Sequence, residues 1–211
     1  MKIIVGLGNP GAKYEHTRHN TGWLTLDQLV ESEKYKVESW QKKFDSEILF
    51  SDHLPAPQPV LRSFNEGGSF SDGGDNNPGH SDYILVKPQT FMNDSGKAVS
   101  EIVNFYKTDI SKDLLIIHDD SDLPLGTIRT ADSSSSAGHN GVQDIIDKLG
   151  TQNFHRIRIG VESRQSRNDM PTDAFVLQNF TADELKKLQA EVFPKVNDEI
   201  EKFIGNLKFE I

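Results

Sequence analysis

The chain has 211 residues, of which 35% are hydrophobic and 26% charged, and this composition favours one soluble globular domain over an unfolded or fibrous protein. It contains no cysteine, which excludes disulfides, thiolate metal sites and a cysteine nucleophile and is compatible with a reducing cytoplasm. Its formal net charge of −9 argues against indiscriminate phosphate binding, so any contact with RNA is expected to be local.

Short apolar runs bounded by turn formers predict three central strands, at 3–5, 83–86 and 114–117. Gly6 ends the first run long before a signal-peptide core could form, and no run approaches the roughly 20 apolar residues of a membrane span. We therefore expect a cytoplasmic protein that is not embedded in a membrane.

Apolar residues at helical spacing predict amphipathic helices at 99–106 and 142–149. Near the end, Thr181 and Glu184 form a capping-box pair before a long helical pattern at 185–207, in which Pro194 predicts a kink or a junction of two helices. Strands that alternate with helices predict one α/β domain, with a central mixed, mostly parallel twisted sheet flanked by helices.

The segment 51–81 differs from the rest of the chain because it is rich in Pro, Gly, Ser, Asp and Asn. Such a composition cannot bury enough apolar surface to offset the entropy of ordering it. We expect a flexible loop insertion within the single domain 1–211.

Standard local signatures of nucleotide-binding proteins and hydrolases fail in this sequence. GLGNPG at 6–11 matches the dinucleotide fingerprint in letters, but the polar segment 12–20 follows it where a packed helix is required. Its glycines are interpreted as a tight strand-to-loop turn. There is no complete phosphate loop, no GxSxG elbow and no HExxH zinc motif.

Polar residues instead follow the predicted strands or stand in loops, namely Asn9, His19, Asn93, Asp119 and Asn140. If these strands are neighbours, their carboxyl ends converge and the five side chains line one cleft. An imidazole can accept a proton from water, a carboxylate can hold its tautomer, and amides can stabilise an oxyanion or orient the water.

Each of these residues also has a structural interpretation. Asn9 beside Pro10 is typical of a turn, and Asn93 or Asp94 could cap a helix that begins near Ser95. His118 and His139 could be structural histidines, and the acidic run that starts at Asp119 could be a solvated loop or bind a hard cation.

Five ordered segments together resemble the bacterial peptidyl-tRNA hydrolase family. They are VGLGNPGAKYEHTRHNTGW at 5–23, KPQTFMNDSGKAV at 87–99, IHDDSDLPLG at 117–126, AGHNGVQDII at 137–146 and NFHRIRIGV at 153–161. The resemblance extends over nearly the whole chain, except the 51–81 insertion, and is thin in the terminal helix.

The resemblance implies that His19 is the base that acts on water and that Asp119 orients it. The residues that it implies for the substrate are Asn9, Tyr14, Phe91, Met92, Asn93, His139 and Asn140. The implied reaction splits peptidyl-tRNA into free peptide and tRNA without a cofactor or metal. The implied partner is peptidyl-tRNA, contacted through its acceptor end and its peptide by a monomer.

Contact with the tRNA phosphates is assigned to a basic strip of Arg129, Arg156 and Arg158, for which the alternative is a salt-bridged sheet edge. The sequence departs from the family here. Ala131 stands where relatives usually carry a second basic residue, and 132–136 replaces a glycine-rich run, so the grip on the tRNA 5′-phosphate is expected to differ.

Two other functions remain open. The same scaffold could bind RNA without hydrolysis, as in a chloroplast splicing factor that resembles this family. Alternatively, the His and Asp residues could form a metal-dependent hydrolase site, which a chelator would inactivate.

Overall fold

The computed structural model describes residues 1–31, 40–51 and 83–205. The predicted insertion at 51–81 lies outside the described residues apart from Ser51, and so does the end of the predicted terminal helix beyond 205. None of the helices within the described ranges is long and apolar enough to cross a bilayer.

The described residues form an α/β domain, as predicted. Its strands are β1 (Lys2–Gly6), β2 (Gln41–Lys43), β3 (Ser46–Phe50), β4 (Tyr83–Pro88), β5 (Leu114–Pro124), β6 (Ile128–Asp132) and β7 (His155–Glu162). Its helices are α1 (Thr21–Glu31), α2 (Ser95–Tyr106), α3 (Ile110–Asp113), α4 (Asn140–Leu149), α5 (Thr172–Val176), α6 (Ala182–Lys187) and α7 (Phe193–Ile204).

The seven strands form one mixed sheet in the order β2-β3-β4-β1-β5-β7-β6. The inner strands β4, β1, β5 and β7 are parallel to one another, whereas β2 and β3 at one edge and β6 at the other pair antiparallel. The three strands predicted from the sequence are consecutive members of this parallel core. Their carboxyl ends therefore meet at one edge of the sheet, which is the position predicted for the cleft.

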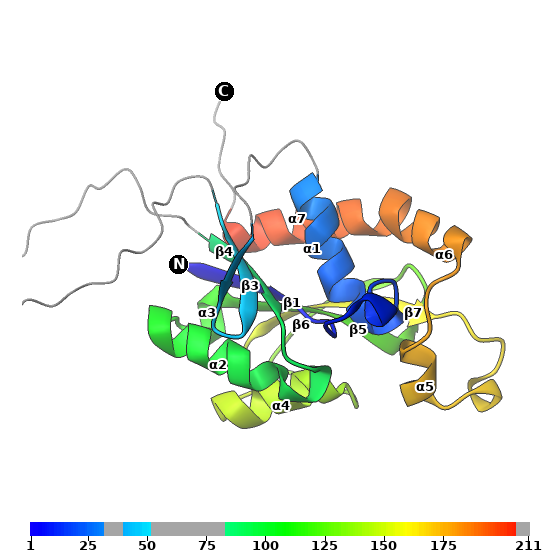
Figure 1. Cartoon of the computed structure of the whole chain (residues 1–211), viewed down its shortest axis with the longest axis horizontal. Helices are drawn as coiled ribbons and strands as arrows, with labels where there is room; N and C mark the ends of the chain where they lie inside the picture. Colours follow the sequence, from blue (N-terminus) through cyan, green and yellow to red (C-terminus); the bar gives the residue numbers. More distant parts are fainter. Residues whose placement is uncertain (32–39, 52–82, 206–211) are drawn as a thin grey trace, which may run out of the picture.

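Helices cover both faces of the sheet (Figure 1). Alternate residues of each inner strand point to opposite faces, so Ile3 and Val5 pack with α2 and α4, whereas Ile4 packs with α1 and α7. Strands buried on both faces explain why the sequence shows continuous apolar runs.

The terminal helical region contains the junction predicted around Pro194. The capping box of Thr181 and Glu184 begins α6, and a wider π-helical turn, Leu188–Val192, leads into α7. Pro194 lies in the first turn of α7, where its missing N–H costs no helical hydrogen bond. The junction is therefore a local widening of the helix that places proline at a permitted position.

The glycines of GLGNPG have a different structural reason from the one predicted. A side chain at Gly6 would collide with the backbone of Gly22 in α1, and one at Gly8 would collide with the ring of Trp23. Only Gly11 of the three has a positive φ, of 109°. Close packing of α1 against β1, more than turn geometry, therefore requires glycine at the first two positions.

Candidate active site

His19 and Asp119, the predicted base and its orienting acid, are in direct contact. His19 lies in the 3₁₀ turn Arg18–Asn20 before α1, and Asp119 lies in the middle of β5. The distance from His19 Nδ1 to Asp119 Oδ1 is 2.8 Å, and both residues are buried. The structure therefore joins two side chains that are 100 positions apart in the sequence.

His139 binds the same carboxylate oxygen. Its Nε2 is 3.0 Å from Asp119 Oδ1, and the backbone N–H of Val142 donates to its Nδ1 at 3.3 Å. Because Nδ1 accepts a hydrogen bond, Nε2 must carry the proton and donate it to Asp119. His139 therefore combines the structural role of a cap on α4 with a direct contact to Asp119.

These contacts set the ionisation of the cluster. Burial opposes the charged form of Asp119, but attraction to His19 and His139 in their protonated forms, together with their hydrogen bonds, holds its pKa well below the usual range. Burial likewise acts to lower the pKa of His19, yet the carboxylate of Asp119 raises it above its ordinary value. Burial lowers the pKa values of His118 and His139, so these imidazoles are neutral. His19 is the imidazole that takes up a proton.

Asn9 is held at the cleft by two partners. The side chain of Asn20 bridges its backbone, accepting from Asn9 N at 2.9 Å and donating to Asn9 O at 3.1 Å. The side-chain oxygen of Asn9 accepts from Met92 N at 2.8 Å. With its oxygen engaged in this way, Asn9 presents its amide NH₂ as a donor.

Two cavities meet at His19. One, of about 410 Å³, is lined by the His19, Asp119 and His139 cluster and by the acidic run up to Asp122. The other, of about 260 Å³, is lined by Asn9, Tyr14, His19, Phe91, Met92, Asn93, Asn140, Asp173, Val176 and Leu177. Asn140 belongs to both. All the predicted catalytic and substrate-binding residues thus line one continuous cleft.

The rim of the smaller cavity is aromatic and apolar. Phe91 is 54% exposed and meets Tyr14 edge-on, with 6.5 Å between the ring centroids. Asp94 occupies the N-cap position of α2, as its structural interpretation predicted, although its side chain makes no capping hydrogen bond there. Asn93 is exposed at the cleft instead.

The cluster could also present three ligand atoms to a metal ion. Within the described residues, His19, Asp119 and His139 place one such atom each within 4.8 Å of one another. However, both histidine nitrogens that face Asp119 are at hydrogen-bond distance from it, so a cation would have to replace these bonds. The geometry describes a hydrogen-bonded cluster.

Comparisons with known proteins show the family to which the chain belongs. The family model described as peptidyl-tRNA hydrolase matches residues 3–210. The chain belongs to the peptidyl-tRNA hydrolase family. A peptidyl-tRNA hydrolase of Mycoplasma capricolum is 40% identical over 99% of this chain and 96% of its own length, and one of Lactobacillus gasseri is 37% identical over 97% and 93%. The crystal structure of peptidyl-tRNA hydrolase from Acinetobacter baumannii matches with a TM-score of 0.66 and 28% identity, covering 98% of this chain and 95% of the other.

The basic strip predicted for this peptidyl-tRNA hydrolase family member is only partly present. Arg129 is exposed and lies opposite Arg158 in the β6–β7 pairing. Arg158 forms an ion pair with Asp120, with 2.5 Å between Nη2 and Oδ2, as the alternative of a salt-bridged sheet edge predicted. Two arginines therefore lie side by side at this edge, and one of them is already paired.

Arg156 has a different position, which corrects its assignment to the strip. It is 2% exposed, and its guanidinium donates to Ser134 Oγ at 3.1 Å, to the Ser135 carbonyl at 2.7 Å and to the Gln152 carbonyl at 3.3 Å. Burial and the neighbouring Arg158 lower its pKa to about 10, so it stays charged at neutral pH. Arg156 thus holds residues 133–136, here called the serine loop, which lead to His139 and Asn140.

Two residues beside His19 were not predicted from the sequence. Asn20 positions Asn9, as described above, and Arg18 anchors the turn. The guanidinium of Arg18 binds Glu184, with 2.8 Å between Nη2 and Oε2, and donates to the carbonyls of Gln178 and Asn179. No local pattern marks these contacts, because their partners are distant in the sequence or depend on the loop conformation.

Proposed function

We propose that this protein hydrolyses the ester that joins a peptide to tRNA, with His19 as the general base. The observation that carries the proposal is the 2.8 Å contact between His19 Nδ1 and Asp119 Oδ1 where the two cavities meet. This contact uses Nδ1 as a donor and leaves the lone pair of Nε2 to accept a proton. Membership in the family supports the same substrate and reaction.

In the proposed reaction His19 Nε2 takes a proton from water while the water oxygen attacks the ester carbonyl. Asp119 remains ionised and stabilises the imidazolium that forms. When the carbon–oxygen bond to the ribose breaks, the imidazolium returns the proton to the leaving oxygen. The products are a peptide with a free carboxyl group and a tRNA with a free terminal hydroxyl, and neither cofactor nor metal takes part.

The amides of the cleft hold the reacting ester. The NH₂ group of Asn9 is a fixed donor, so it can hold the carbonyl of the peptide. Asn93 lies on the peptide side of the cleft, whereas Asn140 borders both cavities and can orient either the water or the terminal ribose. Tyr14 and Phe91 offer an apolar wall that suits peptides of many sequences.

Arg129 and Arg158 are the proposed contacts with tRNA phosphate. The protein is expected to act in the cytoplasm as a monomer. Size-exclusion chromatography of the purified chain checks the oligomeric state. A protein that binds peptidyl-tRNA but never releases peptide would support the RNA-binding alternative.

The decisive experiment measures release of an N-acetylated amino acid from tRNA. His19→Ala should lower kcat/KM by roughly 10²- to 10⁴-fold, because the general base is lost. His155→Ala, which removes an imidazole that lies outside the cleft and pairs with Asp132, serves as the matched control and should retain activity. Wild-type turnover by His19→Ala would remove this residue from the mechanism.

The metal-dependent alternative is tested in the same assay. Dialysis against a chelator should leave the rate unchanged if the cluster works through hydrogen bonds. Loss of activity that returns with a divalent ion would instead favour a metal held by His19, Asp119 and His139.

A further inference from the structure

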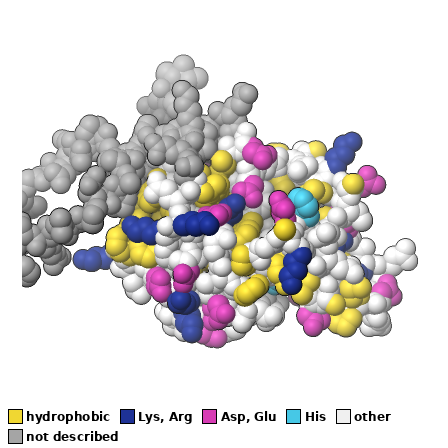
Figure 2. All heavy atoms as spheres, in the orientation of Figure 1, with side chains coloured by type: hydrophobic (Ala, Val, Ile, Leu, Met, Phe, Trp, Pro, Cys, Tyr) yellow, Lys and Arg dark blue, Asp and Glu magenta, His cyan; other side chains and the backbone are white. Residues whose placement is uncertain are grey.

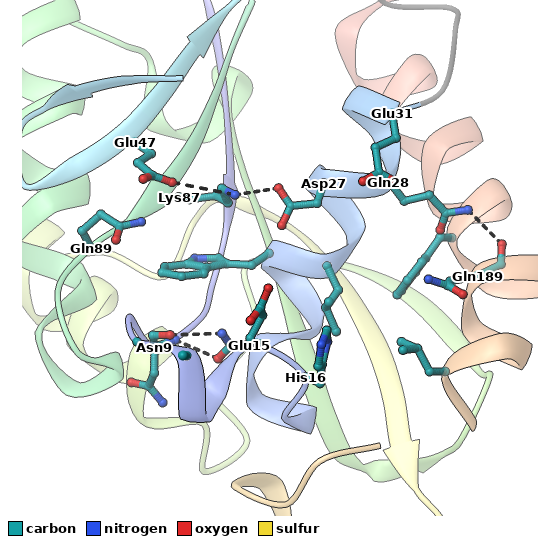
Figure 3. Close-up of a pocket in the computed structure, with 17 residues that line it drawn as sticks. Asn9, Glu15, His16, Asp27, Gln28, Glu31, Glu47, Lys87, Gln89 and Gln189 are labelled. Carbon is teal, nitrogen blue, oxygen red and sulfur yellow. Dashed lines mark hydrogen bonds and ion pairs between the residues drawn. The ribbon is translucent and has the colours of Figure 1, made fainter. Parts of the chain in front are cut away.

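A third cavity, which the proposed chemistry does not use, lies beside the cleft. It measures about 460 Å³ and is walled by the turn before α1, by α1 itself, by the β3–β4 pair and by the start of the terminal helices (Figure 3). Its lining includes the apolar side chains of Trp23, Leu24, Leu185 and Phe193. We call this cavity the acidic chamber, because the acidic residues Glu15, Asp27, Glu31 and Glu47 line it.

The charge of the acidic chamber is unbalanced. Lys87 is the lysine that lines it, and the described wall holds no arginine, so four carboxylates face one ammonium group. The side chain of Lys87 is 9% exposed, and its Nζ lies 2.6 Å from Asp27 Oδ1 and 4.3 Å from the ring centroid of Trp40. Lys87 therefore forms its close ion pair with Asp27, whereas its Nζ lies farther from Glu47 Oε2, at 3.8 Å. The chamber retains a negative potential that favours a cation.

The molecular surface agrees with this description. Figure 2 shows acidic side chains gathered in the region between α1 and β3, with basic side chains among them. In the close-up, Glu47 and Asp27 point toward Lys87 from opposite sides, while Asn9 lies at the opposite end of the chamber (Figure 3).

Asn9 connects the acidic chamber with the cleft, because it lines both. The same two loops also supply walls to both cavities. Gly11 and Gln89 face the chamber, whereas Tyr14 and Phe91, a few residues further along these loops, face the cleft. The two cavities therefore adjoin at Asn9, and the path proposed for the peptide leads from the cleft past this residue into the chamber.

We propose that the acidic chamber binds an ammonium group of the peptide, at a position a few residues before the ester. The inference rests on the proposed function, because it extends the path of the same peptide. An extended peptide advances about 3.3 to 3.6 Å per residue. An ammonium group therefore lies in the chamber only when a particular number of residues separates it from the ester. That ammonium belongs either to the free N-terminus of a short peptide or to a lysine side chain of a longer one.

A series of synthetic peptidyl-tRNAs tests the inference. The peptides have two to six residues, with lysine or uncharged norleucine at one position in turn, and each is made with a free and with an acetylated N-terminus. The expected result is a higher kcat/KM, by about threefold or more, for the charged member at one or two positions. A lysine preference in the acetylated series assigns the chamber to side chains, and a preference for the free N-terminus at one length assigns it to the α-ammonium group.

The double variant Glu31→Gln/Glu47→Gln should reduce this ratio of charged to uncharged substrate toward one. Asp27 is left in place so that buried Lys87 keeps its partner. The matched control Glu101→Gln/Asp198→Asn has the same net charge and changes exposed acids outside the chamber, so it should keep the preference. Circular dichroism confirms that both variants are folded.

Two results would overturn the inference, namely equal rates for charged and uncharged peptides at every length, or a preference that survives the double variant. Both outcomes presuppose that wild-type protein cleaves N-acetyl-aminoacyl-tRNA. Failure of that cleavage overturns the proposed function itself, so the two failures are distinguishable.

Discussion

At the scale of single residues, one carboxylate oxygen organises the cluster of His19, Asp119 and His139. Asp119 Oδ1 accepts from both His19 and His139, while His118 Nδ1 lies 2.7 Å from the backbone carbonyl of Asp119. The three imidazoles differ in ionisation, because Asp119 raises the pKa of His19 whereas burial lowers those of the other two. Of the three imidazoles, His19 is therefore the one that is protonated most readily.

The pH dependence of the reaction follows from this arrangement. The base must be neutral to accept a proton, so kcat/KM should rise with pH through the pKa of His19, with a midpoint above 6.5. Asp119→Asn removes the charge that raises this pKa, so the midpoint should move to lower pH while the rate falls by roughly 10²-fold or more. A pH–rate profile of both proteins measures this. An unchanged midpoint in the variant would mean that another group titrates.

Much of the site could be predicted at this scale, because His19, Asp119, Asn9, Asn93 and Asn140 follow strands or stand in loops. Their convergence requires only that the strands be neighbours, and the apolar runs indicated that. The positions of buried side chains were harder to predict. Arg156 alternates with Arg158 on β7, and nothing in that alternation shows that the serine loop would fold over one arginine and not the other.

At the scale of elements, the conformation of the serine loop between β6 and α4 depends on hydrogen bonds from β7. Arg156 holds its middle, and Ser136 Oγ binds Gln143 Oε1 in α4 at 2.8 Å. The loop ends at His139, the cap of α4. The strands β2, β3, β6 and β7 were not predicted. For the short edge strands β2 and β6 the reason is that pairing is decided by the neighbouring strands more than by their own pattern.

Replacement of Arg156 tests whether this loop positions the cluster. Arg156→Met should lower kcat by roughly ten- to a hundredfold through displacement of His139 and Asn140, with little change in the KM for peptidyl-tRNA or in its salt dependence. Steady-state kinetics at several salt concentrations separate these quantities. A raised KM with unchanged kcat would restore Arg156 to the tRNA contacts.

Ser134→Ala provides a milder version of the same change. It removes one of the hydrogen bonds that Arg156 makes and leaves the guanidinium buried. A smaller fall of kcat in the same direction is expected, and thermal unfolding of both variants shows whether the fold is intact.

At the scale of the whole molecule, a net charge of −9 requires RNA binding to be local. Arg129 is paired with Arg158 through the backbone of the sheet, but its exposed side chain makes no hydrogen bond or ion pair with another residue in the described part of the chain. Its neighbour Arg158 is paired with Asp120, and Ala131 supplies no charge. If this edge binds tRNA phosphate as proposed, the contact should depend most on Arg129.

Arg129→Ala should accordingly raise the KM for peptidyl-tRNA and make it less sensitive to salt, by about one unit in the slope of log affinity against log salt. The kcat should stay near that of the wild type. Lys42→Ala, an exposed lysine of β2 at the other end of the sheet, is the matched control. Equal effects from both variants would mean that total charge, and not this edge, steers the tRNA.

The bond between Arg18 and Glu184 has a consequence for biosynthesis. Residues near the N-terminus leave the ribosome first, yet the turn that carries His19 is fastened to a carboxylate close to the other end of the chain. The base is thus set in place only once the C-terminal helices have been made. A chain cut short before Glu184 should be folded in part and inactive, so activity should appear only after the segment with Glu184 has been made and has packed against the turn of His19.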